Sequence, residues 1–395
     1  MRKPVKGALL GLKVIDFTRL LPGPLATMLM GDLGAEIIKI ELPQSPDYAR
    51  NFPPHKGGES MAFLNYNHSK QSFAIDYTKE EGKKILLDLI KTSDVFIEQF
   101  RPDYLSKMGL GYEDLKKINP KLIYVSLTGY GQTGKYKNLA GHDLNYAGLA
   151  GGLAGNQFSA PQMPSVQMAD IAGGSYMAVI GCLAALYART RTGEGQWVDV
   201  AMLDGTMPLA INALAWHWIT GKPEPRDNSF LSGGMINYNI YPCKDNKYIA
   251  LGALEFKFWQ KFCQITQKNQ WLNRMLPQNK TQFEEWKNEL ADFFKTEDSI
   301  FWIKLGTDND IPITPIYEID EIENDEHIRE RKMIVEVEHQ KAGKIKNIGV
   351  PIQFSETPSE VFRASPLLGQ DNEAILREMG ISENAISELK EKKII

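Results

Sequence analysis

Short apolar stretches alternate with amphipathic segments through the first third of the chain. Uninterrupted apolar runs are typical of buried strands, and apolar residues three and four apart are typical of helices. We expect strands at 13–18, 36–41, 72–77, 94–100 and 121–128, and helices at 23–34 and 79–93. Strands that alternate with helices build a mostly parallel sheet with helices on both faces, so the pattern predicts an α/β fold.

Two of the expected helices carry recognisable start signals. Pro24 suits the first turn of the helix at 23–34, because an N–H group would have no partner there. Thr78 and Glu81 have the spacing of a capping box ahead of the helix at 79–93. We therefore expect the Thr78 side chain to cap that helix.

The pattern changes after a break rich in proline, glycine and polar residues at 223–234. The segment 236–255 has the pattern of two strands joined at Asp245-Asn246, a pair that favours turns. Helical, charged segments continue to about residue 330. This predicts a second, smaller α+β domain.

Composition narrows the class of protein. The 395 residues are 43% hydrophobic and 24% charged, which suits a globular protein with a large core. The formal net charge of −4 gives no reason to expect nucleic acid or an anionic membrane as a partner. Cys182, Cys243 and Cys263 are far apart and lack the spacing of zinc ligands, so we expect no metal site and a reducing compartment, the cytoplasm.

One long stretch, 144–188, has a single charged side chain, Asp170, and it begins directly after the pair His142 and Asp143. An isolated carboxylate in apolar surroundings tends to have a perturbed pKa and to mark a functional site. Within the stretch, 171–188 is uncharged and rich in small residues. We expect it to form a helix packed in the protein core rather than a membrane span, for which it is barely long enough.

Two effects oppose each other at Asp170. Apolar surroundings raise the pKa of a carboxyl group, whereas the positive end of a helix dipole lowers it if Asp170 begins the helix that follows. Taken alone, Asp170 could equally serve as a helix N-cap, and His142 as a packing or surface residue. Glu255 alone would be a surface or capping residue, and Asp143 has a structural role behind the site as the alternative to a substrate contact.

Ligands of parallel sheets bind at the carboxyl ends of the strands. The residues at those ends should therefore lie along one edge of the sheet: Arg19, Leu20, Leu42, Tyr77, Gln99, Phe100, Arg101, Gly129, Tyr130 and Gly131. Lys70 and Arg101 are candidates to supply positive charge there for a phosphate group.

The segment 129–134, GYGQTG, matches the dinucleotide fingerprint GxGxxG after an expected strand. No helical period follows it, and no acidic residue stands about 20 positions further on, as that fingerprint requires. We expect instead a glycine-lined loop that lets the backbone approach a ligand.

Several stretches together, DFTRLLPGPLATMLMGDLGAEIIKIE, FRPDYLSKMGL, SLTGYGQTG, MADIAGG and ARTRTGEGQWVDVAMLDG, resemble the family III CoA-transferase (CaiB/BaiF) superfamily along essentially the whole chain. The resemblance implies a homodimer of two interlocked chains, each with a Rossmann-like large domain and a small domain. We expect the large, CoA-binding domain at 1–222, the small α+β domain at 223–330, and a C-terminal segment at 331–395 that returns to the large domain.

Within the superfamily, GHDLNYAGLAGGL resembles the α-methylacyl-CoA racemase branch. That resemblance implies His142 and Asp170 as the two acid/bases and Glu255, in GALEFKFW, as a third catalytic residue. It implies an acyl-CoA substrate, with coenzyme A as part of the substrate and no permanently bound cofactor. With the strand-end rule, it implies contacts to CoA or substrate from Arg19, Leu20, Leu42, Ala74, Ile75, Asp76, Tyr77, Gln99, Phe100, Arg101, Gly141, Asp143, Leu144, Asn145 and Tyr146.

The racemase branch implies isomerisation of 2-methylacyl-CoA thioesters by proton removal and return at the α carbon. In the transferase branch the aspartate matching Asp170 is instead a nucleophile that forms an acyl anhydride and then a CoA thioester, and the histidine is typically missing. A noncatalytic acyl-CoA-binding protein is a third alternative. The chain departs from the family before Glu255, where the usual proline and Asp-Gly turn are absent.

Overall fold

The computed structural model describes residues 4–154, 161–225, 229 and 231–395. The chain forms two compact units. Unit 1 takes Met1–Ala150, Pro164–Leu209 and His327–Ile395, and unit 2 takes Gly151–Met163 and Ala210–Glu326. Part of the expected break at 223–234 lies outside the described residues.

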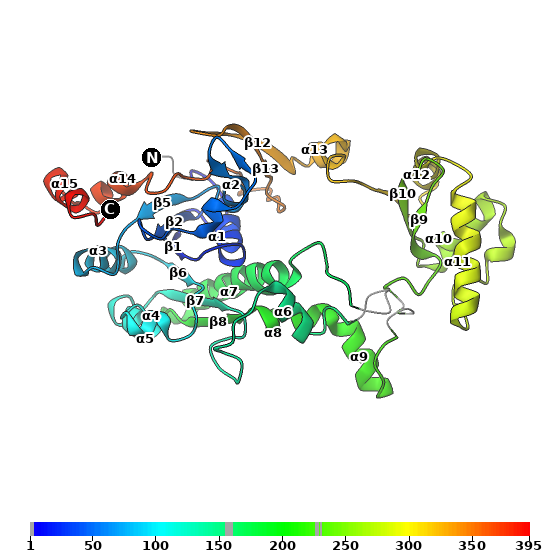
Figure 1. The fold of residues 1–395 in the computed structure, drawn as a ribbon, viewed down its shortest axis with the longest axis horizontal. Coiled ribbons are helices and arrows are strands. Elements are labelled where there is room, and N and C mark those ends of the chain that lie inside the picture. The colour runs from blue at the N-terminus through cyan, green and yellow to red at the C-terminus, as the bar shows by residue number, and fades with distance from the viewer. Residues whose placement is uncertain (1–3, 155–160, 226–228, 230) are drawn as a thin grey trace. The chain divides into compact units, whose positions relative to one another are not determined.

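A six-stranded parallel sheet forms the centre of unit 1 (Figure 1). Its strands are β1 (Lys13–Phe17), β2 (Glu36–Glu41), β5 (Gln71–Ala74), β6 (Val95–Glu98), β7 (Ile123–Thr128) and β8 (Trp197–Ala201), in the order β5-β2-β1-β6-β7-β8. The register places Ile15 beside Ile38 on one side and beside Phe96 on the other. The predicted α/β fold is confirmed, and the strand order reverses direction between β1 and β6.

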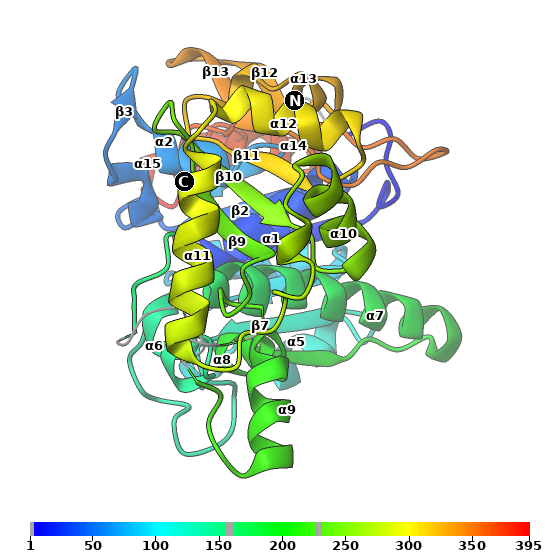
Figure 2. The ribbon, with the colours of Figure 1, turned by 90° about the vertical axis from the view of Figure 1, so that its right-hand side faces the viewer.

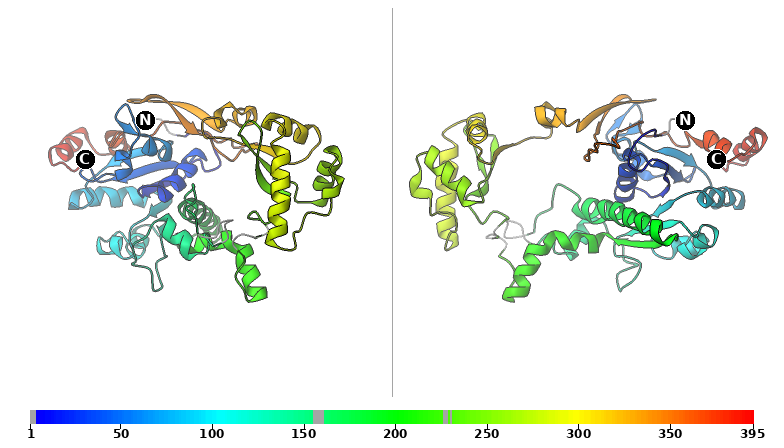
Figure 3. Two further views of the ribbon diagram at one scale, coloured as in Figure 1. Left: turned by 45° about the vertical axis from the view of Figure 1, so that its right-hand side comes forward. Right: turned by 180° about the vertical axis from the view of Figure 1, so that it is seen from behind.

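Alternate residues of a strand point to opposite faces of the sheet, and nearly all residues of β1, β5, β6 and β7 are buried. Helices therefore cover both faces. Ile15, Phe73 and Phe96 pack with α3, α5, α14 and α15 in one core cluster, and α1 and α7 pack together against the other face (Figure 3). The helices of unit 1 are α1 (Pro22–Asp32), α2 (Met61–Tyr66), α3 (Glu80–Lys91), α4 (Tyr104–Lys107), α5 (Tyr112–Ile118), α6 (Asp143–Leu149), η2 (Ala169–Tyr176), α7 (Met177–Thr192), α8 (Met202–Thr206), α14 (Asn372–Glu378) and α15 (Glu383–Glu391).

The remaining elements of unit 1 are short. They are the turn η1 (Tyr48–Asn51), the hairpin β3 (His55–Lys56) and β4 (Glu59–Ser60), and the hairpin β12 (Ile334–His339) and β13 (Gly343–Ile348). The segments η3 (Met207–Ala210) and α13 (Glu326–Glu330) span the boundaries between the units.

Unit 2 is a three-stranded antiparallel sheet with helices packed around it (Figure 2). The predicted turn at Asp245-Asn246 is confirmed: it joins β9 to β10, and Asn246 takes the left-handed conformation that asparagine tolerates. The strand order is β11-β10-β9. The elements are α9 (Ile211–Thr220), β9 (Tyr238–Pro242), β10 (Tyr248–Gly252), α10 (Phe256–Ile265), η4 (Asn269–Trp271), α11 (Lys280–Phe294), α12 (Ser299–Asp308), β11 (Ile313–Ile316) and η5 (Ile322–Asn324).

The capping box at the start of α3 is a wrong prediction. The N-cap is Lys79, and no side chain caps the helix. The Thr78 hydroxyl donates instead to Asp76 Oδ1 at 2.5 Å. The Asp76 carboxylate is a stronger acceptor than a neutral group, and it stands only two residues earlier, so it accepts the hydrogen bond of the hydroxyl.

The helix that contains the uncharged stretch 171–188 runs from Ala169 to Thr192, first as the wider π turns of η2 and then as α7. Ala178, Cys182 and Ala185 are buried, and the helix packs against α1, β7 and β8. It is long and apolar enough to cross a membrane by length and composition, and 39% of its most apolar window is buried in the chain by itself. One side therefore belongs to the core of unit 1, as expected, and the other is uncovered in a single chain.

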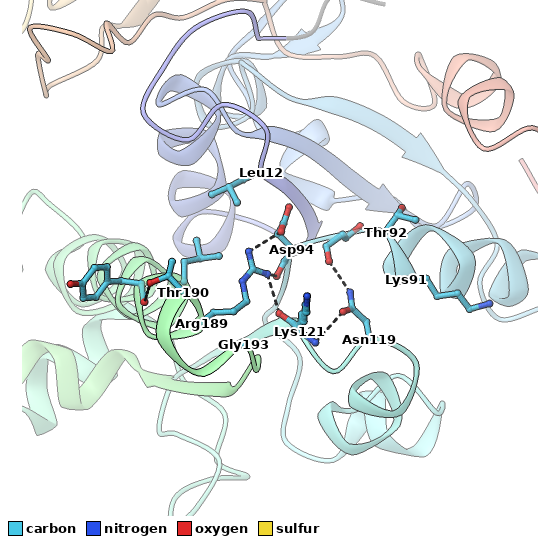
Figure 4. A pocket seen from close by; sticks show the side chains of 12 residues that line it. Leu12, Lys91, Thr92, Asp94, Asn119, Lys121, Arg189, Thr190 and Gly193 are labelled. Carbon is cyan, nitrogen blue, oxygen red and sulfur yellow. Dashed lines mark hydrogen bonds and ion pairs between the residues drawn. The ribbon is translucent and has the colours of Figure 1, made fainter.

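A cavity of about 630 Å³ opens at the amino edge of the sheet (Figure 4). Arg189 binds Asp94 Oδ1 at 2.8 Å and the Lys121 carbonyl at 3.0 Å, and Asp94 Oδ2 accepts the N–H of Lys13 at 2.9 Å. The starts of β1, β6 and β7 are thereby tied to the end of α7.

We expect Arg189→Ala to lower the free energy of unfolding by roughly 1–2 kcal/mol, because it removes a partly buried ion pair and a charged hydrogen bond. Lys91→Ala is the matched control, since Lys91 lines the same cavity and pairs with the partly exposed Asp88, three residues earlier. Urea unfolding measures both. Equal stabilities of the two variants would contradict the role given to Arg189.

Candidate active site

A second cavity, of about 350 Å³, lies at the carboxyl edge of the sheet in unit 1. Leu20 follows β1 and Gln99 to Arg101 follow β6, so the cavity opens where the strand order reverses. His142 and Asp170, which are 28 positions apart in the sequence, both line it. Such a reversal point is where open α/β sheets bind their ligands.

The predicted site residues divide into three groups. Those that line the cavity are Leu20, Gln99, Phe100, Arg101, Gly141, His142, Tyr146 and Asp170. Those of unit 1 that do not line it are Arg19, Leu42, Ala74, Ile75, Asp76, Tyr77, Asp143, Leu144 and Asn145. Glu255 belongs to unit 2, where it stands exposed as the N-cap residue of α10 without a side-chain capping bond.

Buried ion pairs hold the loop that carries Leu20. Lys39 Nζ binds the Thr18 carbonyl at 2.9 Å and Asp47 Oδ2 at 3.1 Å, and the Asp47 carboxylate accepts the Leu20 N–H. Leu20 has φ +63°, a left-handed conformation that costs energy in a leucine. The Lys39–Asp47 pair therefore keeps a strained residue at the rim of the cavity.

Lys70 cannot serve a phosphate, so that expectation is wrong. Its side chain is fully buried, and its Nζ binds Asp16 Oδ2 at 2.9 Å and the Pro24 carbonyl at 2.8 Å. Burial lowers the pKa of Lys70 to about 8 despite Asp16. Burial alone would raise the pKa of Asp16, but the positive charges of Lys70 and Lys39 outweigh burial and hold that pKa at about 2. Arg101 remains as the predicted cation that lines the cavity.

The turn at Gln99 and Phe100 is anchored on both sides. Gln99 Oε1 accepts the N–H of Gly23 at 3.0 Å, and the Phe100 N–H donates to Glu98 Oε2 at 2.8 Å. Burial raises the pKa of Glu98 to about 7. The guanidinium of Arg19 lies 5.3 Å from the Phe100 ring centre, so Arg19 stands beside the cavity without lining it.

The segment 74–77 is held by the C-terminal part of the chain. Ala74 exchanges two hydrogen bonds with Asn372, and the Asp76 N–H donates to the Ile394 carbonyl. Tyr77 is buried, and burial raises its pKa to about 12. These residues follow β5, the outer strand of the sheet, and they do not line the cavity.

His142 is the N-cap residue of α6, and its neighbours in the motif fix its turn. The Asn145 Oδ1 atom accepts the His142 N–H at 3.0 Å, and the Tyr146 hydroxyl donates to the Gly141 carbonyl. Gly129 has no room for a side chain, because a Cβ atom there would lie 2.4 Å from the Tyr146 ring. The loop 129–134 leads into no helix before α6, so the rejection of a dinucleotide fingerprint holds.

Asp170 lies inside the first turn of η2, after the N-cap residue Met168, so its interpretation as an N-cap is wrong. Burial raises its pKa to about 7, and the nearby charge of Asp143 adds to that rise. The shift has the direction expected from apolar surroundings. The N–H groups of Ala169 and Asp170 bind Asp143 Oδ1 at 2.7 and 2.9 Å, so they are not free to serve a substrate oxygen.

Sequence reasoning missed several residues that line the cavity, among them Tyr48, Lys137 and Met202. Lys137 follows the glycine-rich loop 129–134, and a cation next to such a loop could have been predicted to face the ligand. Tyr48 and Met202 carried none, because long-range packing brings them there. Among residues 4–154, 161–225, 229 and 231–395, no group of three or more His, Cys, Asp or Glu side chains is placed to hold a metal ion.

The raised pKa of Asp170 predicts a stability effect. Between the unfolded value of 3.8 and about 7, the folded chain keeps a proton that the unfolded chain releases, so stability falls as pH rises through this window. Asp170→Asn removes this penalty. We expect it to raise the free energy of unfolding at pH 8 by on the order of 3 kcal/mol, with the gain shrinking toward pH 4. Thermal unfolding at both pH values measures this; a variant no more stable than wild type at pH 8 would refute it.

The chain matches the sequence profile of CoA-transferase family III over residues 9–372. It is 33% identical over 390 residues to the succinyl-CoA:glutarate CoA-transferase of Homo sapiens, covering 96% of this chain and 88% of that protein. It is 32% identical over 397 residues to the alpha-methylacyl-CoA racemase of Homo sapiens, covering 98% and 97%. The solved structure of a CaiB/BaiF family protein from Brucella suis is similar to it with a TM-score of 0.81 and 28% identity over 95% of this chain and all of that one. The protein belongs to CoA-transferase family III.

Proposed function

We propose that the protein is a racemase or epimerase of 2-methylacyl-CoA thioesters, with His142 and Asp170 as its two acid/bases. The observation that carries the proposal is that an imidazole and a carboxyl group with a pKa of about 7 line one cavity. Inversion at a carbon needs one group to remove the proton and another to return a proton to the opposite face. A carboxyl group that titrates near neutrality suits this task, because it is available in both protonation states.

In this mechanism one acid/base takes the proton next to the thioester carbonyl, and the other delivers a proton to the other face of the enolate. The apolar surroundings that raise the pKa of Asp170 let it act as an acid as well as a base. Glu255, carried over from the resemblance, is the third group of the proposed set. The proposal needs no resident cofactor, because coenzyme A arrives as part of the substrate.

The proposal places the CoA moiety at the reversal point of the sheet. Leu20, Gln99, Phe100 and Arg101 line the cavity there, and Arg101 offers a positive charge to the phosphate groups. The remaining predicted CoA contacts, from Leu42 and the segment 74–77, stay predictions. A cytoplasmic location is part of the proposal and is supported by the three cysteines, which are all free and buried.

The alternative is a CoA-transferase that moves CoA between carboxylic acids through an Asp170 acyl anhydride and an aspartyl-CoA thioester. What favours it is that relatives named as CoA-transferases match this chain as well as the racemase does. In that mechanism Asp170 attacks as a nucleophile, and His142 has no required part.

Variants of His142 separate the two mechanisms. We expect His142→Ala and His142→Gln to lower the rate of inversion of a 2-methylacyl-CoA by about 10²–10⁴-fold, since inversion needs a group on each face. A transferase would keep most of its CoA transfer in both variants. Chiral chromatography of the acyl product and a CoA-transfer assay with a dicarboxylate measure the two activities.

Hydroxylamine is the control for this prediction, because it traps an aspartyl-CoA thioester and has nothing to attack in a proton-transfer cycle. Full activity of His142→Ala, or covalent modification of Asp170 by hydroxylamine during turnover, would end the racemase proposal.

We also propose that the protein is an interlocked homodimer, as the resemblance implies. Single chains leave apolar side chains uncovered: Tyr187 of α7 is 67% exposed, and Trp218 and Ile219 of α9 are 67% and 85% exposed. Neighbouring large apolar side chains left exposed on one helix, as Trp218 and Ile219 are, suit an association surface.

We expect light scattering to give about twice the chain mass of 44.5 kDa at every concentration tested. Trp218→Glu together with Ile219→Glu should weaken the assembly. A stable and active monomer of the wild-type chain would contradict the proposal.

A further inference from the structure

We propose that Asp143 is a positioning residue that holds Asp170 in a fixed place relative to His142 and keeps a negative charge beside it. This inference rests on the proposed function only in the roles of His142 and Asp170. Asp143 was expected to contact CoA or substrate, but it does not line the cavity. Its side chain turns instead to the start of the helix that carries Asp170.

The contacts of Asp143 are specific. One oxygen, Oδ1, accepts the N–H groups of both Ala169 and Asp170, at 2.7 and 2.9 Å. The first N–H groups of a helix have no partner within the helix. Ala169 is fully buried, so its N–H cannot turn to water instead. Without Asp143 the helix start would keep unpaired buried donors and would have to move.

The backbone of Asp143 follows directly on His142. The turn of His142 is itself held by Asn145, which accepts the His142 N–H, and by Tyr146, whose hydroxyl binds the Gly141 carbonyl. The side chain of Asp143 thus joins the two elements that present the acid/base groups. A displacement of about 1 Å between such groups can cost about 10²-fold in rate, so this link matters for two-sided chemistry.

The charge of Asp143 has a function separate from its hydrogen bonds. Serine and asparagine cap helix starts as well as aspartate does, so a capping role alone does not require a carboxylate. A carboxylate beside Asp170 opposes ionisation of Asp170, in the same direction as burial does.

The other charged and titratable groups of the elements around Asp170 are placed differently. His142, Tyr146 and Arg101 line the cavity with it. Asp32 at the end of α1 binds His68 and Ser69, and Asp199 of β8 accepts the Gln132 N–H. Asp204 of α8 is exposed, and Arg189 and Arg191 lie at the far end of α7. Asp143 is the charged group that raises the pKa of Asp170 together with burial.

Three variants separate the hydrogen bonds from the charge. Asp143→Ser and Asp143→Asn keep an oxygen acceptor and remove the charge, and Asp143→Ala removes both. Asp204→Asn is the matched control, because it removes an exposed carboxylate of a helix that packs on η2. All variants are made in the full chain.

The first measurement follows protonation of Asp170 directly. A water-soluble carbodiimide with an amine labels protonated carboxyl groups, and peptide mass spectrometry reports labelling of Asp170 against pH. We expect a midpoint near pH 7 in wild type and in Asp204→Asn, and a lower midpoint in Asp143→Asn and Asp143→Ser. An unchanged midpoint in both uncharged variants would overturn the proposed role of the charge.

The second measurement follows the backbone. Amide hydrogen exchange at Ala169 and Asp170 should speed up at least tenfold in Asp143→Ala and stay slow in Asp143→Ser. Equal protection in wild type and Asp143→Ala would overturn the positioning role. If Asp143→Ala does not fold, the Asn and Ser variants still decide the role of the charge, and loss of folding on removal of the acceptor supports the backbone role.

The third measurement is catalytic. Inversion should fall by about 10²-fold in Asp143→Ala, and in Asp143→Asn the pH profile of inversion should shift in the direction of the labelling midpoint. If wild type performs no inversion, the proposed function fails. The labelling and exchange results still decide whether Asp143 positions Asp170.

Discussion

The reversal of strand order between β1 and β6 is the constraint on which the rest of the structure depends. The connections that leave these two neighbouring strands run to opposite sides of the sheet, so the space above their carboxyl ends stays open. The loops after β1 and β6 and the turn before α6 form the walls of the cavity in that space. Every group proposed for the chemistry in unit 1 is attached to one of these walls or to η2.

Buried electrostatics then give the open edge a defined shape. Lys39, Asp47, Asp16 and Lys70 are fully buried, and their pairs fix the loop after β1, including the strained Leu20. Charges can be buried here because each one has a partner and further hydrogen bonds. Asp170 is different, since the charged group that acts on it is another carboxylate. Burial is the larger cause of its raised pKa and the charge of Asp143 adds to it, so this carboxyl group can exchange protons at neutral pH.

Much of this architecture follows from local pattern. The strands at 13–18, 36–41 and 121–128 were predictable because buried parallel strands are uninterrupted apolar runs, and Asp170 was conspicuous because no other charge stands near it in the sequence. The strand β8 was missed, since Trp197–Ala201 is a short run interrupted by Asp199 at the end of a charged stretch.

The sequence alone could not decide which hydrogen-bond or ion-pair partner a side chain takes when the candidates lie far apart in the chain. Lys70 is of a residue type that often binds phosphate, but its ammonium group binds Asp16, 54 positions earlier. Asp143 stands in its motif where a substrate contact was expected, but its carboxylate accepts the N–H groups of Ala169 and Asp170. Local rules rank such partners by type, and only the fold decides which partner is within reach.

The central claim is that His142 and Asp170 act on opposite faces of one carbon atom. The most direct test is to give the wild-type protein one enantiomer of a 2-methylacyl-CoA in deuterium oxide and to follow both the configuration and the label at the α carbon. The account predicts that deuterium enters at the α carbon together with inversion, starting from either enantiomer. Transfer of CoA to an added carboxylic acid with no label at the α carbon would contradict it.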